Sequence, residues 1–311
     1  MSILLATHLD AAELALWRRE LEAVLPGEHW VLRADEARPE DIDIAIVANP
    51  PSGALAGLPH LRLIQSLWAG VDRLLADASV PHDVPLARMV DPAMNEAMAQ
   101  TALWAVLSLH RGFFRYARQQ REGRWQPLPQ RRADEVEVLV LGLGQMGATT
   151  AQHLARVGYR VTGWSTRAAQ VPGVQSSAGE EALDALLASA DIVVNLLPLT
   201  ARTRDFFDAR RFAAMKRGAG FVNLARGAHV VEDDLIAALD SQQLSHAVLD
   251  VFRAEPLPAA HAFWSHPQVF LLPHAAAQTD ARSAAAVAAR NVRAARAGHS
   301  VHHLVDRARG Y

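Results

Sequence analysis

Three side chains in the second half of the chain have the chemistry to hold and protonate a small carbonyl compound. Arg226, Glu255 and His274 stand at or shortly after the carboxyl ends of predicted buried strands, where catalytic groups of open α/β sheets collect. A guanidinium can bind a carboxylate and polarise a keto oxygen, and an imidazole titrates near neutral pH and can deliver a proton. A carboxylate on the other ring nitrogen would orient that imidazole and favour its protonated form. We therefore predict that these three residues form the catalytic set.

Each of these three residues, considered alone, could instead have a purely structural role. Arg226 would then form a salt bridge at a strand end, Glu255 would be a loop acid before a proline, and His274 would be a satisfied histidine after a turn. The catalytic interpretation gains weight because the three follow successive strands and because a dinucleotide loop precedes them.

That loop is the end of a strand at 136–141, which runs into GLGQMG at 142–147. In a GxGxxG loop the first glycine permits a tight turn, the second lets the backbone approach a pyrophosphate, and the third lets the next helix pack on the sheet. A predicted helix at 148–157 and a strand at 159–164 complete a βαβ unit, which favours dinucleotide binding over a chance match. The predicted phosphate-binding residues are Gly142, Gly144, Gln145, Met146 and Gly147.

The residues after the second strand of that unit indicate which dinucleotide is bound. NAD sites usually place an acid there, which binds the ribose 2′-hydroxyl. This chain instead has Trp164, Ser165, Thr166 and Arg167, and hydroxyls with a guanidinium suit a 2′-phosphate. We predict NADPH as the cofactor, with weaker use of NADH. The alternative is that Arg167 is only a solvated loop residue.

Alternating predicted elements indicate an α/β fold. The predicted strands are 2–7, 30–34, 42–48, 61–67, 86–90, 136–141, 159–164, 191–197, 221–225, 246–251 and 269–272. The predicted helices are 11–25, 94–114, 148–157, 183–188 and 232–239. The stretch 115–132 is expected to be an exposed arm that packs against a second subunit.

The loop after the fourth predicted strand is a candidate substrate loop. Ligands bind beyond the carboxyl ends of parallel strands, and Gly70 would allow close backbone approach. The predicted substrate-binding residues are Trp68, Ala69, Gly70 and Val71. A simple strand-to-helix turn is the alternative.

Composition limits the classes of function. The 311 residues are 50% hydrophobic and 21% charged, which is ordinary for a globular chain long enough for two domains. A net charge of −2 gives no support for binding nucleic acid or an anionic membrane. The chain has no cysteine, which excludes disulfides and thiolate catalysis, and its histidines form no evident ligand set, so we predict no metal site. With no signal sequence or membrane span evident, we expect a cytoplasmic location.

Several segments together resemble a known family. Asn223–Gly227, Leu249–Leu257 and Pro273–His274 resemble the D-isomer-specific 2-hydroxyacid dehydrogenases, and the match extends along the chain. Four further segments resemble the glyoxylate/hydroxypyruvate reductase A branch of that family. These are Trp125–Pro129, Trp164–Ser165, Val230–Leu235 and Val305–Tyr311.

The resemblance implies two doubly wound parallel-sheet domains. A flavodoxin-like substrate domain would comprise residues 1–98 completed by 282–311, and a Rossmann cofactor domain would comprise 99–281. It also implies a homodimer built on the cofactor domains. Asp250 would bind the nicotinamide carboxamide, and Leu197, Pro198 and Ala225 would also contact the cofactor.

The chain departs from the branch at a few positions. Ala48 and Asn49 replace an aromatic and a histidine that are common near the substrate, and Trp68 replaces a small residue. These differences bear on the side-chain pocket. Thr166 precedes Arg167 where the branch tends to have arginine directly after serine, which bears on the strength of the NADPH preference.

The activity that the resemblance implies is NADPH-dependent reduction of small 2-keto acids, such as glyoxylate to glycolate and hydroxypyruvate to D-glycerate. Backbone amides at Ala69, Gly70 and Val71 would hold the substrate carboxylate with Arg226. One alternative is a dehydrogenase of a bulkier D-2-hydroxy acid, with Trp68 shaping the pocket. Another is a nucleotide-sensing binding module with the same fold. Hydride transfer from a one-carbon or phosphorus acid is a third, although no dedicated residue points to it.

Overall fold

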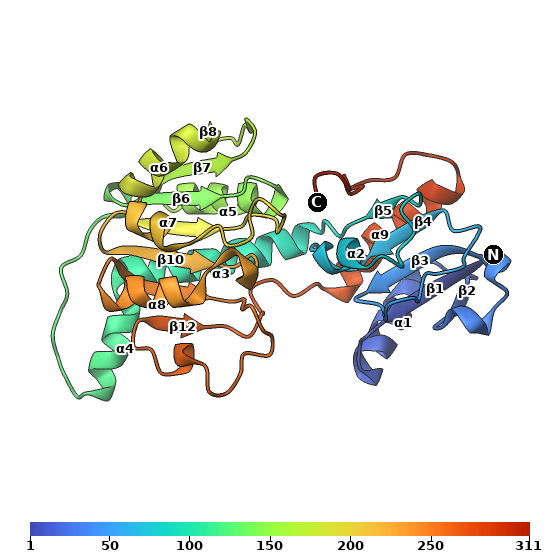
Figure 1. The fold of residues 1–311 in the computed structure, drawn as a ribbon, viewed down its shortest axis with the longest axis horizontal. Coiled ribbons are helices and arrows are strands. Elements are labelled where there is room, and N and C mark those ends of the chain that lie inside the picture. The colour runs from blue at the N-terminus through green and yellow to red at the C-terminus, as the bar shows by residue number, and fades with distance from the viewer. The chain divides into compact units, whose positions relative to one another are not determined.

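Two parallel sheets, one of five strands and one of seven, form the framework of the protein (Figure 1). The computed structural model describes all residues from 1 to 311. They divide into unit 1, Met1–Met94 with Thr279–Tyr311, and unit 2, Asn95–Gln278.

The sheet of unit 1 has the order β2-β1-β3-β4-β5. All of its pairings are parallel, and this order is that of flavodoxin-like doubly wound sheets. The strand at its centre, Ile42–Ala48, is buried along its whole length, as expected where helices cover both faces of a parallel sheet. The strands are β1 (Ser2–Thr7), β2 (His29–Val31), β3 (Ile42–Ala48), β4 (Leu63–Ser66) and β5 (Leu86–Ala87). The helices are α1 (Ala11–Val24), α2 (Asp72–Ala76) and α9 (Ala281–Arg296).

The last helix, α9, is tied to the rest of unit 1 by a largely buried ion pair. Arg296 donates to both carboxylate oxygens of Asp43 at 2.8 Å and to Glu28 at 2.5 Å. The Asp43 side chain is only 2% exposed, so removing its cation would leave a buried charge without compensation. Asn291 of the same helix donates to Gln65 of β4 at 2.7 Å. These contacts bind the end of the chain to a sheet made from its beginning.

The sheet of unit 2 has the order β12-β11-β10-β9-β6-β7-β8, and all of its pairings are parallel. Counted from β6, this is the Rossmann order 3-2-1-4-5-6 with one strand added at the edge. The strands are β6 (Glu137–Leu141), β7 (Arg160–Ser165), β8 (Gln175–Ala178), β9 (Ile192–Asn195), β10 (Ala219–Asn223), β11 (Leu244–Leu249) and β12 (Val269–Leu271). The helices are α3 (Pro92–Arg111), which begins in unit 1, α4 (Phe113–Arg121), α5 (Gln145–Arg156), α6 (Glu180–Ser189), α7 (Ala209–Ala214) and α8 (Glu232–Asp240).

Two apolar clusters cover the two faces of this sheet. One joins the strands to α3 and α5, for example through Ala102, Val106 and Leu154. The other joins them to α6, α7 and α8, for example through Leu187 and Phe212. Helices therefore cover both faces of the sheet, as the sequence predicted for a doubly wound α/β fold.

Every predicted strand has a counterpart, but three local predictions were wrong. The helix expected at 94–114 ends at Arg111, because Gly112 has a left-handed backbone with φ 69°. Part of the expected arm at 115–132 is the helix α4, which ends at Arg121, and only 122–132 lies outside helices and strands. The edge strand β8 was not predicted, since its sequence Gln-Ser-Ser-Ala is polar and has no alternating pattern.

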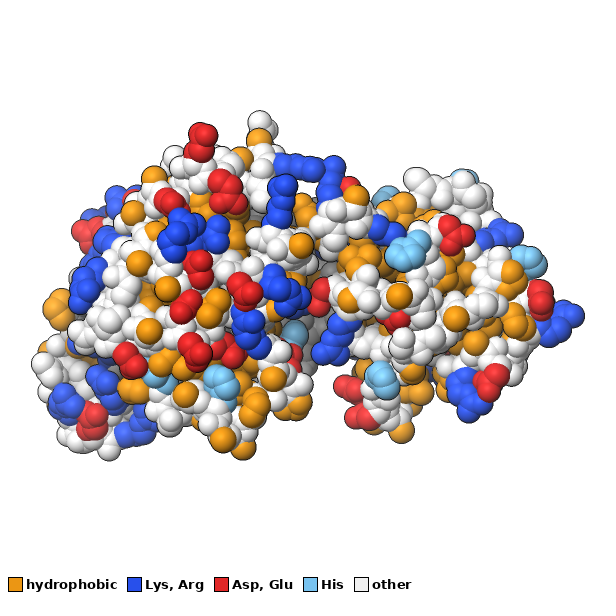
Figure 2. Space-filling view, viewed as in Figure 1, with side chains coloured by type: hydrophobic (Ala, Val, Ile, Leu, Met, Phe, Trp, Pro, Cys, Tyr) orange, Lys and Arg blue, Asp and Glu red, His pale blue; other side chains and the backbone are white.

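The outer surface carries charges of both signs. Figure 2 shows acidic and basic side chains interspersed, in keeping with the net charge of −2. No helix combines the length and the apolar character needed to span a bilayer.

Candidate active site

The turn after β10 presents Arg226 at the carboxyl edge of the sheet in unit 2. Arg226 is partly buried, and its Nη1 donates to the carbonyl of Ala225 at 2.7 Å. A Cβ atom on Gly227 would lie 1.9 Å from the backbone carbon of Phe252. This position must therefore be glycine for the turn to pack against the segment that follows β11. The packing thus requires glycine directly after Arg226.

Glu255 and His274 form a hydrogen-bonded pair. The distance between Oε2 of Glu255 and Nδ1 of His274 is 2.7 Å, and the other carboxylate oxygen of Glu255 accepts from the amide of Phe252 at 2.9 Å. The bond to Glu255 raises the pKa of His274, although partial burial opposes this. Burial alone would raise the pKa of Glu255, but the bonds from His274 and Phe252 outweigh it and hold that pKa below its ordinary value. The pair therefore favours a charged carboxylate beside a protonated imidazole.

The backbone of His274 is held in an uncommon conformation by Asp250. His274 has φ 54°, in the left-handed region that few residues other than glycine adopt. Its amide donates to the carbonyl of Asp250 at 2.9 Å. The Asp250 carboxylate accepts from the amides of Ala275 at 2.7 Å and of Ala276 at 3.1 Å. Burial raises the pKa of Asp250, and these two amides partly offset that rise.

The three predicted catalytic side chains lie within electrostatic reach of one another. The positive charge of Arg226 lowers the pKa of both Glu255 and His274. The structure thus brings Arg226, Glu255 and His274 together at the carboxyl ends of β10, β11 and β12. A cation, an imidazole and the carboxylate bonded to that imidazole thus lie close enough for their charges to interact.

The glycine loop between β6 and α5 has the shape that a dinucleotide requires. Gly142 has φ 96°, and a Cβ atom on Gly147 would lie 1.7 Å from the carbonyl oxygen of Gly142. A Cβ atom on Gly144 would meet nothing within 4 Å, so open space remains in front of the helix. No side chain caps the amino end of α5. The free amides and the helix dipole at this end fit a pyrophosphate.

The end of β7 and the loop after it carry an aromatic ring that points inward and polar groups at the surface. The Trp164 ring is buried, and its Nε1 donates to the carbonyl of Gly179 at 2.8 Å. The Ser165 hydroxyl donates to the carbonyl of Arg167 at 2.6 Å. Thr166 and Arg167 are exposed. The side chains available to a ligand here are therefore those of residues 165–167.

Sequence reasoning missed a buried polar network beneath the Arg226 turn. Asn195 and Asn223 are the last residues of the neighbouring strands β9 and β10, and His229 follows Arg226 by three positions. All three are almost completely buried. The signal that could have revealed them was an asparagine at the end of each of two adjacent apolar strands.

The predicted substrate loop, residues 68–71, belongs to unit 1, whereas the catalytic set belongs to unit 2. It directly follows β4, and the Ser66 hydroxyl bonds both to the amide and to the carbonyl of Trp68 at 3.0 Å. The Trp68 ring lies edge-on to that of Trp17 in α1, with the ring centres 6.1 Å apart. The first residue of the loop is thus fixed at its backbone and at its side chain.

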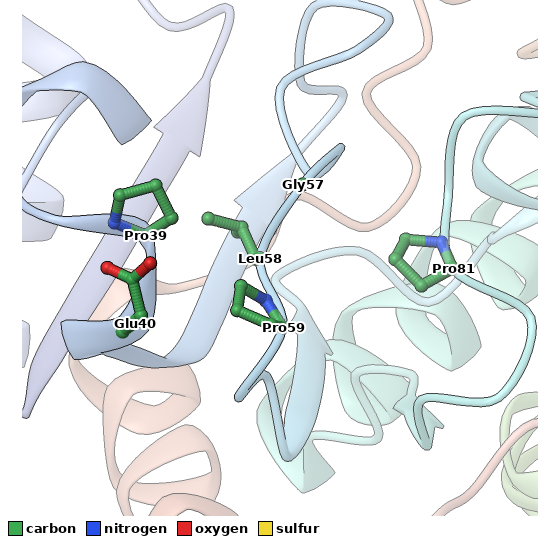
Figure 3. Close-up of a pocket in the computed structure, with 6 residues that line it drawn as sticks. All are labelled: Pro39, Glu40, Gly57, Leu58, Pro59 and Pro81. Atoms are coloured by element: carbon green, nitrogen blue, oxygen red, sulfur yellow. The ribbon is translucent and has the colours of Figure 1, made fainter.

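A shallow hollow of about 420 Å³ elsewhere in unit 1 does not resemble a site for an anionic substrate (Figure 3). Its lining consists of Pro39, Glu40, Gly57, Leu58, Pro59 and Pro81. These residues precede β3, β4 and β5, so the hollow lies at the amino ends of the strands. Its only charged side chain is an acid, which would repel a carboxylate.

Comparison with known sequences gives consistent matches. The sequence model of the family described as D-isomer specific 2-hydroxyacid dehydrogenase, NAD binding domain, matches residues 103–276. A glyoxylate/hydroxypyruvate reductase A of Serratia proteamaculans (strain 568) is 41% identical over 274 residues, covering 86% of this chain and 88% of that protein. The protein of the same name from Klebsiella pneumoniae (strain 342) is 39% identical over 303 residues, covering 95% and 96%.

Solved structures match over the whole chain. A D-isomer specific 2-hydroxyacid dehydrogenase from Xanthobacter autotrophicus Py2, in complex with NADPH and MES, gives a TM-score of 0.95 at 42% identity and covers 100% of this chain and 99% of that one. The NADPH-dependent glyoxylate/hydroxypyruvate reductase from Sinorhizobium meliloti, in complex with NADP and sulfate, gives 0.91 at 32% identity and covers 100% of both chains.

The hydrogen bond from Glu255 yields a prediction about protonation. Replacing Glu255 with glutamine removes the carboxylate that favours imidazolium, so the pKa of His274 should fall. In the unaltered protein the protonated form of His274 should persist to higher pH than in the variant. A titration of the histidine ring signals by NMR measures both midpoints.

The control in the same titration is His246, whose pKa burial and the charges of Arg115 and Arg118 lower to about 4. Its midpoint should not respond to the Glu255 change. An unchanged midpoint for His274 would show that Glu255 does not control its protonation.

Proposed function

We propose, on the premise that this chain belongs to the D-isomer specific 2-hydroxyacid dehydrogenase family, that it is an NADPH-preferring reductase of small 2-keto acids. It converts glyoxylate to glycolate and hydroxypyruvate to D-glycerate. The observation that carries this proposal is the Glu255–His274 bond of 2.7 Å within electrostatic reach of Arg226. The relatives named glyoxylate/hydroxypyruvate reductase A support the choice of substrates.

The catalytic roles follow from the side-chain chemistry. Arg226 binds the substrate carboxylate and draws electron density toward the keto oxygen. His274, held through Nδ1 by Glu255, delivers a proton from its other ring nitrogen to that oxygen. Glu255 keeps the imidazole oriented and charged before the transfer. The bound nicotinamide supplies the hydride that the carbonyl carbon requires.

The cofactor is NADPH, with NADH as a weaker substitute. The open space at Gly144 and the uncapped start of α5 suit the pyrophosphate, and residues 165–167 suit the 2′-phosphate. Asp250 binds the nicotinamide carboxamide in addition to holding the His274 backbone. The remaining proposed contacts are those of Gly142, Gln145, Met146, Gly147, Trp164, Leu197, Pro198 and Ala225. Solved relatives bound to NADPH or NADP support this assignment.

We assign unit 1 as the substrate domain and unit 2 as the cofactor domain. The glycine loop in unit 2 supports the second assignment. In unit 1, the amides of Ala69, Gly70 and Val71 follow a parallel strand at its carboxyl end, where ligands of such sheets bind. We propose that they hold the substrate carboxylate together with Arg226. The cytoplasmic location stays a prediction from the sequence.

The first test is the initial rate of NADPH and of NADH oxidation with glyoxylate, hydroxypyruvate and pyruvate. We expect fast NADPH oxidation with the two small substrates. Replacing His274 with alanine removes the proton donor and should lower kcat by at least about 100-fold, while the Kd for NADPH stays near that of the unaltered protein. His246→Ala is the matched control, since His246 lies in the same unit on the amino half of β11.

The outcomes separate the alternatives. Poor turnover of glyoxylate with good turnover of a larger 2-keto acid would favour a dehydrogenase of a bulkier D-2-hydroxy acid. NADPH binding without turnover of any 2-keto acid would favour a nucleotide-sensing module. Full activity of the His274 variant would overturn the proposed proton donor.

The cofactor preference has its own test in Arg167→Ala. Losing a charged hydrogen bond to the 2′-phosphate should lower kcat/KM for NADPH by about 10- to 100-fold, while kcat/KM for NADH changes little. Arg160→Ala is the control, because Arg160 begins β7, the strand that leads to Arg167, and pairs with Glu137 at 2.7 Å. An equal loss with both cofactors would mean that Arg167 does not select the 2′-phosphate.

We further propose a homodimer formed through unit 2. Three large apolar side chains support this: Trp104 on α3, Phe113 on α4 and Trp125 in the arm are 43%, 49% and 99% exposed. Burying such rings between subunits would remove them from water. Light scattering should give about twice the 33.8 kDa of one chain. A mass of a single chain at the assay concentration would contradict the proposal.

A further inference from the structure

Three buried polar side chains lie directly beneath the turn that carries Arg226. Asn195 ends β9, Asn223 ends β10, and His229 closes the short 3₁₀ turn after Arg226. Their exposed fractions are 0%, 1% and 0%. Groups buried this deeply are expected to have hydrogen-bond partners, so the question is what their bonds hold in place.

Asn195 is at the centre of the network. One hydrogen of its Nδ2 goes to Oδ1 of Asn223 at 3.0 Å and the other goes to Nδ1 of His229 at 3.0 Å. Its Oδ1 accepts from the amide of Leu197 at 3.2 Å. The orientation of this amide group is therefore set, because each of its atoms has a partner of the matching kind.

The partners of His229 fix its tautomer. Nδ1 receives a hydrogen from Asn195, so it carries none, and Nε2 then donates to the carbonyl of Pro198 at 3.3 Å. A second ring proton, on Nδ1, would point at the Asn195 amino group. Two hydrogen-bond donors would then face each other, which is unfavourable. His229 is thus a neutral bridge between the end of β9 and the segment after it, not a second proton donor.

Asn223 extends the network to the catalytic arginine. Its Nδ2 donates to the backbone carbonyl of Arg226 at 3.0 Å, and its Oδ1 accepts from the amide of Ala225 at 3.3 Å. The amide of His229 also donates to the Arg226 carbonyl, at 3.2 Å. The network therefore forms hydrogen bonds both to the backbone of the Arg226 turn and to the backbone of the Leu197–Pro198 segment.

We propose that Asn195, Asn223 and His229 are positioning residues that fix the Arg226 guanidinium relative to the 197–198 segment. This inference builds on the proposed function, in which Arg226 holds the keto acid and residues 197 and 198 contact the cofactor. None of the three touches a reacting atom. Their role is to keep the substrate carbonyl and the hydride donor correctly positioned relative to each other. Small displacements of such groups lower the reaction rate strongly.

The test compares two replacements of His229. His229→Leu is close in size but leaves one hydrogen of the Asn195 amino group without an acceptor. It also removes the bond to the Pro198 carbonyl, which keeps only the bond from the Thr203 hydroxyl. His229→Gln can still accept from Asn195 through Oε1 and donate to Pro198 through Nε2. We expect kcat/KM for glyoxylate with NADPH to fall on the order of 10- to 100-fold in the leucine variant, and the glutamine variant to recover most of it. His246→Leu is the control for placing leucine at another histidine of unit 2.

A second measurement does not need turnover. The Nε–H signal of Arg226 in a ¹H–¹⁵N NMR spectrum, assigned by its loss in Arg226→Lys, reports the surroundings of the guanidinium. The chemical shift of this signal should change in His229→Leu and remain unchanged in His246→Leu. An unmoved Arg226 signal in a folded His229→Leu protein, or unchanged kcat/KM, would overturn the inference. Absence of turnover in the unaltered protein would count against the proposed function only, since the Arg226 signal would still decide the positioning role.

Discussion

A parallel sheet that is covered on both faces leaves little room for unpaired polar side chains within its strands, and this constraint shapes the candidate site. The carboxyl halves of β9, β10 and β11 are apolar up to their last positions, where Asn195, Asn223 and Asp250 lie at or just after the strand ends. Because the strands run in the same direction, these polar ends meet at one edge. The parallel direction of the strands therefore determines where the candidate site lies, and the individual residues determine its chemistry.

The buried polar groups at that edge bind backbone rather than solvent. Asp250 receives the amides of Ala275 and Ala276, and Asn223 holds the carbonyl of Arg226. Asp250 thus fixes the loop that follows the neighbouring strand β12, and Asn223 fixes the loop that follows its own strand. The long side chains of Arg226 and His274 then extend from loops whose backbones are already constrained, which limits the freedom they lose when a substrate binds.

The sequence was sufficient for the parts of the structure that depend on local pattern. Apolar runs located the strands, and GLGQMG at 142–147 located the turn into α5. The break at Gly112, the polar strand β8 and the partners of His229 could not be predicted in the same way. The left-handed turn at Gly112 and the polar sequence of β8 carry no distinctive local pattern. The bond between His229 and Asn195 joins residues 34 positions apart, and a single sequence does not show which distant residues are in contact.

The left-handed backbone at His274 couples the stability of the protein to its chemistry. A residue with a Cβ atom is strained at φ 54°, at a cost of about 1 kcal/mol or more. Glycine would relieve that strain, but it could not serve as the proposed proton donor. Random drift toward a more stable sequence would therefore tend to inactivate the protein at this position, and only selection for turnover opposes it. At position 274 the stability of the fold favours glycine, whereas the proposed activity favours histidine.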